Sequence, residues 1–209
     1  AVNDVGAITE AGGLLNASGS TAPVTGNIRT NDTDQNNNIS STPIESLRSG
    51  GVEGVGEIAT DGGTTFSVSG RYGTLTVTKA TGAYSYSLTQ DNASVEALAP
   101  GQTLQDVFNY TVIDSTNLTD NGLVTITING ADDEMTIQGL PSAPLDFSED
   151  LAAELAATFM LVDPDSASAP VALRFVTSEG TLAASGGVGV TVIGTETGTL
   201  IASASNLSN

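Results

Sequence analysis

The stretch "YGTLTVTKATGAYSYSLTQ", Tyr72 to Gln90, carries the alternation that decides the fold. Leu75 and Val77 alternate with threonines, and after a turn at Lys79–Gly82 the apolar positions resume between serines. A period of two places apolar side chains on one face of a strand and polar ones on the other. The stretch therefore predicts a β-hairpin with one buried face and one wet face.

The same alternation continues in "VFNYTVID", residues 107–114, and in "LVTITING", residues 123–130. Between the hairpin and these strands, "DNASVEALAP" predicts a single helical turn that begins at Asp91 or Ser94 and stops at Pro100. Short strands separated by turn signals are typical of an antiparallel β-sandwich. We expect this architecture for the first 130 or so residues.

A second unit is expected after the acidic stretch "NGADDEM", residues 129–135, because alternation starts again at Met135. The predicted domains are residues 1–133 and 134–209, an all-β chain of tandem antiparallel β-sandwiches. About 75 residues are few for a seven-stranded sandwich, so the second is expected to be partial. Its stretch "EDLAAELAATFML", residues 149–161, favours helix by composition but lies among β signals, and we interpret it as strand or irregular.

The composition excludes several classes of function. The chain has 24 acidic and five basic side chains, a net charge of −19, which argues against nucleic acid and anionic membranes as partners. Without Cys or His it has no Ser-His-Asp or Cys-His nucleophile, and any metal must be bound through oxygen, as calcium is. No apolar run approaches the roughly 20 residues of a membrane span, so no direct membrane insertion is expected.

Oxygen donors are concentrated in "GNIRTNDTDQNNNIS", residues 26–40, which contains Asp32 and Asp34. In a sandwich the first strand leaves one pole and the second returns to it, so these aspartates are expected beside Asp4. The hairpin "VIDSTNLTDNG", residues 112–122, turns at the same pole and brings Asp114 near. Such carboxylates repel at roughly 1 kcal/mol or more per pair unless a cation lies among them. A calcium ion with six to eight oxygen ligands suits this pole, although an Asp at position 114 also serves a β-turn without metal. Asp120 is interpreted as a turn residue.

The two halves share an order of acidic features, as tandem arrays do. Each has an acidic linker, then an early acid, then an Asp-x-Asp pair. The members are Asp4, Glu10, Asp32 and Asp34 in the first half, and Asp132, Asp133, Glu149, Asp150, Asp163 and Asp165 in the second.

Five segments of residues 1–133 resemble the VCBS repeat in order: "AVNDVGAITEAGG", "GNIRTNDTD", "GRYGTLTVTKATGAYSYSL", "VEALAPGQTLQDVFNYTVID" and "VTITINGADD". VCBS repeats are cadherin-like or immunoglobulin-like β-sandwich modules of large, type I secreted bacterial surface adhesins of the repeats-in-toxin kind. Residues 135–209 are similar to another cadherin-like module of these adhesins, through "GLPSAPLDFSED", "VDPDSAS" and "EGTLAASGGVGVTV".

The resemblance implies calcium at the interdomain linkers. It points to Asp4, Asp32, Asp34 and Asp114 at the first linker and to Asp132, Asp133, Asp163 and Asp165 at the second. Glu10 corresponds to the first-strand acid that in cadherins reaches the following linker, and Glu149 or Asp150 to the same element of the second unit. The chain departs from the family pattern at "QNNN" after "NDTD" and at "ADDEM", where Asn-Asp-Ala-Pro is common.

The resemblance implies a calcium-binding structural spacer at the bacterial cell surface whose partners are neighbouring modules. An enzyme is not expected, because the acids lie in polar loops rather than in an apolar cleft that would raise the pKa of one of them. The alternative is a carbohydrate-binding module that stacks sugars on tyrosines, although these alternate with serines as core residues do. The tyrosines are Tyr72, Tyr84, Tyr86 and Tyr110.

Overall fold

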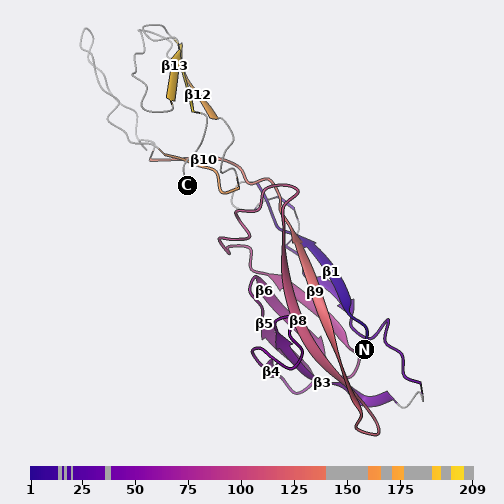
Figure 1. Cartoon of the computed structure of the whole chain (residues 1–209). Coiled ribbons are helices and arrows are strands. Elements are labelled where there is room, and N and C mark those ends of the chain that lie inside the picture. The colour runs from indigo at the N-terminus through magenta and orange to yellow at the C-terminus, as the bar shows by residue number, and fades with distance from the viewer. Residues whose placement is uncertain are drawn as a thin grey trace. The chain divides into compact units, whose positions relative to one another are not determined.

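The structure is a computed structural model of the chain, and its described residues form strands and turns without an α-helix. The described residues are 1–13, 16, 18–19, 21–35, 39–139, 160–165, 171–176, 190–193 and 199–204. They fall into two compact units, Ala1–Asp133 and Glu134–Asn209 (Figure 1). Among them, no helix is long and apolar enough to cross a membrane. The all-β fold class predicted from the alternation is therefore confirmed.

The first unit is a sandwich of two sheets. One has four strands in the order β1-β9-β8-β3, and the other has five in the order β2-β7-β6-β5-β4. The strands of the first sheet are β1 (Asp4–Thr9), β9 (Thr119–Asn129), β8 (Thr103–Asp114) and β3 (Ile39–Ser49). Those of the second are β2 (Val24–Asn27), β7 (Ala83–Leu88), β6 (Gly73–Thr78), β5 (Thr65–Ser69) and β4 (Thr60–Asp61). The pair β1–β9 is parallel, which corrects the prediction of a purely antiparallel sandwich.

The hairpin predicted from the quoted stretch is β6–β7. Leu75 lies opposite Tyr86 and Val77 opposite Tyr84, and all four side chains are buried. The facing sheet contributes buried residues from alternate positions of β8 and β9, among them Phe108, whose ring meets that of Tyr86 edge-on at 6.0 Å between centroids. Two sheets with facing apolar sides therefore make one core.

The predicted helical turn after β7 is a pair of hydrogen-bonded turns. The Glu96 amide donates to the Asn92 carbonyl at 3.0 Å, a single helical bond. The Asn92 side chain accepts from the Ser94 amide at 3.0 Å, so Asn92 starts the turn and the prediction of Asp91 or Ser94 was wrong. An Asn side chain reaches the amide two residues ahead, which favours this geometry.

One carboxylate is buried inside the sandwich. Asp106 of β8 is 3% exposed, and its two oxygens accept from the amides of Arg71 and Tyr72, both at 3.0 Å, and from the Tyr86 hydroxyl at 2.9 Å. The three bonds compensate the loss of water around the charge. They also tie the turn between β5 and β6 to the opposite sheet.

The second unit has two small described sheets. In one, β10 (Thr136–Gln138) pairs with β11 (Met160–Val162). In the other, β14 (Thr199–Ala204) lies between β12 (Val171–Val176) and β13 (Val190–Ile193). Of the stretch interpreted as strand or irregular, Met160 and Leu161 belong to β11, and residues 149–159 lie outside the described residues.

Candidate metal centres

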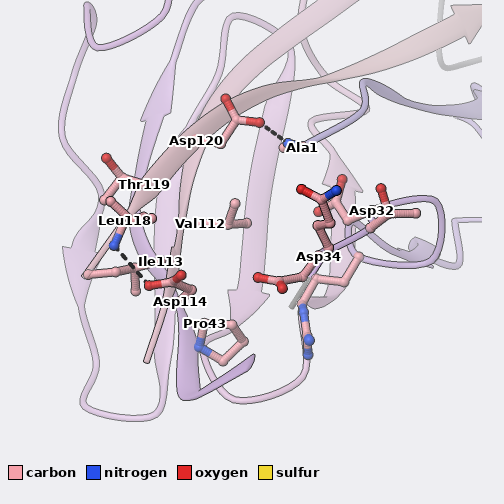
Figure 2. Close-up of a pocket in the computed structure, with 13 residues that line it drawn as sticks. Ala1, Asp32, Asp34, Pro43, Val112, Ile113, Asp114, Leu118, Thr119 and Asp120 are labelled. Atoms are coloured by element: carbon pink, nitrogen blue, oxygen red, sulfur yellow. Dashed lines mark hydrogen bonds and ion pairs between the residues drawn. The ribbon is translucent and has the colours of Figure 1, made fainter. Parts of the chain in front are cut away.

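A pocket of about 290 Å³ lies at the pole of the first unit where β1 begins. Four aspartates line it: Asp32, Asp34, Asp114 and Asp120. Figure 2 shows Asp114 and Asp120 on the β8–β9 hairpin side and Asp32 and Asp34 on the loop that follows β2. Three of these residues, Asp32, Asp34 and Asp114, are ones that the sequence predicts as metal ligands. The fourth, Asp120, is predicted as a turn residue and not as a ligand. Asp120 lies opposite Val112 in the hairpin, so strand spacing could have placed it at the same pole as Asp114.

Asp4 lies beside this pocket, on the side of β1 that faces the core. Its Oδ2 accepts from the Tyr110 hydroxyl at 2.9 Å, and the neighbouring Val2 amide donates to Asp32 Oδ1 at 2.6 Å. Burial, and secondarily the charge of Asp32, raise the pKa of Asp4 from 3.8 to about 6. The second oxygen of Asp32 is buried and accepts no hydrogen bond from the described residues. Asp4 and Asp32 therefore carry more negative charge than the hydrogen bonds that they accept can offset.

Positive charge at the pocket comes from two groups. The amino group of Ala1 pairs with Asp120, and Arg29 is the one basic side chain in the lining. Asp114 also shapes its own turn, because its Oδ1 accepts from the amides of Thr116 at 2.7 Å and Leu118 at 2.8 Å. Asp114 therefore serves the hairpin turn whether or not it binds a metal.

Asp4 and Asp32 are close enough to repel each other, but the present positions of the acidic side chains do not complete a coordination shell. In the described part of the chain, no group of three acidic side chains is arranged to hold an ion as it stands. Asp34 and Asp120 are exposed to solvent. The acidic side chains at this pole offer only oxygen atoms as metal ligands, which are the ligands that a hard divalent cation prefers.

A second group of acids lies at the opposite pole of the first unit. Because β1 and β9 are parallel, Glu10 and the segment after Asn129 emerge together. Glu10 is 1% exposed, and its Oε1 accepts from the Ala131 amide at 2.9 Å. Asp133 is 6% exposed, and the Asp132 side chain is exposed. Glu10 thus reaches the segment that follows β9.

Glycine at position 12 allows this segment to lie close against the first unit. The Gly13 amide donates to the Asp132 carbonyl at 2.7 Å, and a Cβ at Gly12 would lie only 2.6 Å from that carbonyl oxygen. Together with the bond from Ala131 to Glu10, these contacts make residues 130–133 part of the first unit.

The second unit has its own acids near its start. Thr136 of β10 lies opposite Val162 of β11, and Asp163 directly follows β11. Asp163 and Asp165 are half-buried. Glu149 and Asp150 lie outside the described residues.

The tyrosines on which the carbohydrate alternative depended belong to the core. Their exposed fractions are 5% for Tyr72, 6% for Tyr84, 0% for Tyr86 and 1% for Tyr110. A sugar-stacking site requires an accessible ring face. The four tyrosines therefore do not support a carbohydrate-binding site.

No family model matches the chain, and no curated protein matches it. Among solved structures, it is similar to protocadherin gamma B2 extracellular cadherin domains 3–6, with 12% identity and a TM-score of 0.38. It is also similar to the protocadherin gamma B7 EC3–6 cis-dimer structure, with 13% identity and a TM-score of 0.34. Each match covers 99% of this chain and 38% of the other. Both similar structures are cadherin extracellular domains.

The raised pKa of Asp4 makes the stability of the first unit depend on pH. Between pH 4 and 6 the folded chain holds a proton that the unfolded chain releases, so the free energy of unfolding should fall as pH rises through this window. The difference between the two pKa values corresponds to at most about 3 kcal/mol, and screening of the partly exposed carboxylate lowers this to about 1–2 kcal/mol. Urea unfolding in chelator at pH 5 and pH 7 measures the part of this change that falls above pH 5. Asp4→Asn should flatten the dependence, and an unchanged slope in that variant would assign it to other groups.

Proposed function

We propose that this chain is a calcium-binding structural segment of a bacterial surface adhesin, related to the VCBS repeat, that acts as a spacer. The observation that carries the proposal is the set of five aspartates at one pole of the first unit. Asp4 and Asp32 lie within electrostatic reach of each other, and Asp32 shares its pocket with three further aspartates and a single arginine. Such an excess of carboxylate oxygen is stabilised by a divalent cation.

Calcium supplies positive charge that the side chains at this pole lack. Asp32 and Asp34 would hold it from the loop after β2, and Asp114 and Asp120 from the β8–β9 hairpin, with Asp4 from the first strand. Because the folded chain gathers these groups and the unfolded chain does not, ion binding adds to the free energy of unfolding. The loop, the hairpin and the start of β1 would be fixed together.

The second proposed site uses the acids on either side of the junction at residues 133–134. In the first unit these are Glu10, Asp132 and Asp133, and in the second Asp163 and Asp165. The buried position of Glu10 beside Ala131 supports the part of this assignment that lies in the first unit. Calcium bound at the linker would stiffen it. The partners of the chain would be neighbouring modules of the same protein, outside the cell, and its role would be structural rather than catalytic.

The replacement of Asp32 and Asp34 by asparagine tests the first site. The double variant should bind at least one calcium ion fewer than the unmodified chain, as counted by isothermal titration or by mass spectrometry under native conditions. Asparagine keeps the size of each side chain and one acceptor oxygen but removes its charge, and fewer charged ligands weaken calcium binding. Asp91→Asn, at an exposed turn outside the pocket, is the matched control. If the double variant binds as many ions as the control, these two residues do not belong to a calcium site.

A further inference from the structure

The first and last strands of the first unit lie side by side and run in the same direction. β1 and β9 pair in parallel over six residues, from Asp4 opposite Val124 to Thr9 opposite Asn129. The chain enters the unit through β1, at the edge of its sheet, and leaves it through β9. Because the strands are parallel, the entry before Asp4 and the exit after Asn129 lie at opposite ends of the same pair (Figure 1).

Hydrogen bonds outside the strands lengthen this pair at both ends. Where the strands begin, the Leu123 amide donates to Asn3 Oδ1 at 2.9 Å. Where they end, further bonds continue the pairing. They join the Glu10 amide to the Asn129 carbonyl at 3.0 Å, the Ala131 amide to Glu10 Oε1 at 2.9 Å, and the Gly13 amide to the Asp132 carbonyl at 2.7 Å. The bonded contact therefore extends from Asn3 to Gly13 along the first segment.

Tension along the chain loads this pair in shear. A pull on both sides of the unit draws β1 towards its N-terminal end and β9 towards its C-terminal end, which are opposite directions along one axis. The interstrand hydrogen bonds cross between the strands, so they resist this sliding together. A pull at right angles to the strands would instead break the same bonds one after another.

The core adds to the resistance against sliding. Ile8 of β1 lies opposite Ile128 of β9, and both side chains are buried. A slip by one residue would turn the core-facing side chains of β1 to the opposite face of the sheet. The two strands therefore cannot slide past each other without disrupting the core as well as the hydrogen bonds.

We propose that the β1–β9 pair is a shear clamp, which lets the first unit bear tension along the chain without unfolding. The clamp consists of the backbone pairing and the bonds that lengthen it, from Asn3 to Gly13, and it needs no calcium. That tension acts on the chain rests on the proposed function as a spacer. The clamp itself stands or falls separately from the calcium sites.

Single-molecule force spectroscopy of the full chain in chelator tests the clamp. The chain has no cysteine, so two introduced cysteines define the points of attachment. Val2→Cys with Met135→Cys loads the pair in shear. Val2→Cys with Leu118→Cys pulls at the pole where both strands begin, and so peels β1 from β9. The three positions are accessible, with exposed fractions of 51% for Val2, 36% for Met135 and 70% for Leu118.

The unfolding force should depend strongly on the direction of the pull. Forced unfolding reports the rate of crossing the unfolding barrier, and at equal loading rates the force should be at least about twofold higher in shear than in peeling. A gain in extended length that matches the residues between the cysteines identifies each event as unfolding of the first unit. Equal forces in the two directions, or a lower force in shear, would overturn the proposal.

Two substitutions of Ile8 test whether the β1–β9 bonds carry the load. The Glu10 amide bonds to β9, and alternate amides of a parallel strand face the same neighbour, so the Ile8 amide also faces β9. Ile8→Pro removes this donor, whereas Ile8→Ala shortens the buried side chain and keeps the donor. In the shear direction Ile8→Pro should unfold at a force at least about 1.5-fold lower than Ile8→Ala.

Circular dichroism verifies that both Ile8 variants are folded. Equal shear forces in the two folded variants would contradict the role given to the β1–β9 bonds. If Ile8→Pro does not fold, the comparison of the two pulling directions decides the proposal.

Discussion

Replacement of Asp106 by alanine is expected to lower the free energy of unfolding of the first unit by about 3–5 kcal/mol. The substitution removes the acceptor of three donors, the part-buried amide of Arg71, the buried amide of Tyr72 and the buried hydroxyl of Tyr86. The Tyr72 amide and the Tyr86 hydroxyl would then be buried without a partner, which costs more than the net gain of an ordinary hydrogen bond. Urea unfolding in chelator measures the change.

Tyrosine fluorescence is a specific probe for this measurement. The chain has four tyrosines and no tryptophan, and all four tyrosines belong to the first unit. Tyr86→Phe removes only one of the three donors and should cost about 1 kcal/mol. Asp91→Ala, at an exposed turn, should change stability by less than about 0.5 kcal/mol. A loss for Asp106→Ala no larger than that for Asp91→Ala would contradict the structural role assigned to Asp106.

Two substitutions of Glu10 should separate its structural role from its proposed metal role. Glu10→Ala leaves the Ala131 amide without its acceptor and creates a cavity, so in chelator it should lose about 2–4 kcal/mol. Glu10→Gln keeps a carbonyl oxygen for the Ala131 amide and removes a buried charge. In chelator it should therefore be as stable as the unmodified chain.

Calcium should make the stability of Glu10→Gln differ from that of the unmodified chain. The unmodified chain should gain stability when calcium is added, and Glu10→Gln should gain markedly less, because an amide is a weaker ligand than a carboxylate. Parallel urea titrations with calcium and with chelator give both differences. Equal calcium gains in the two proteins would leave Glu10 with a hydrogen-bonding role only.

Alternation was enough to predict the β6–β7 hairpin and the strands β8 and β9. Leu75, Val77, Tyr84 and Tyr86 occupy the buried face that their period of two requires. The parallel pairing of β1 with β9 could not be predicted this way, because alternation shows which face of a strand is buried and not which strand lies beside it. The role of Asp106 was also missed, since its three donors come from distant positions in the sequence.

The sandwich topology was enough to predict that aspartates from distant parts of the sequence lie near one another at one pole. Asp32, Asp34 and Asp114 share a pocket because strands of a sandwich return to the same pole, and Asp4 lies within electrostatic reach of Asp32 for the same reason. Asp120 was missed because its neighbours Asn121 and Gly122 are typical of a turn, whereas the β9 strand already begins at Thr119. The extent of a strand depends on its partner strand as much as on local sequence.

Calcium titration followed by thermal unfolding and small-angle X-ray scattering tests the central claim most directly. With calcium at about 1,000 times its Kd, the free energy of unfolding should rise by about 4 kcal/mol, and the tyrosine-monitored melting temperature should rise by about 10–15 degrees. The particle length from scattering should change when chelator is added, because the linker loses its ion. Unchanged melting and unchanged particle length in calcium and in chelator would contradict the calcium-stiffened spacer.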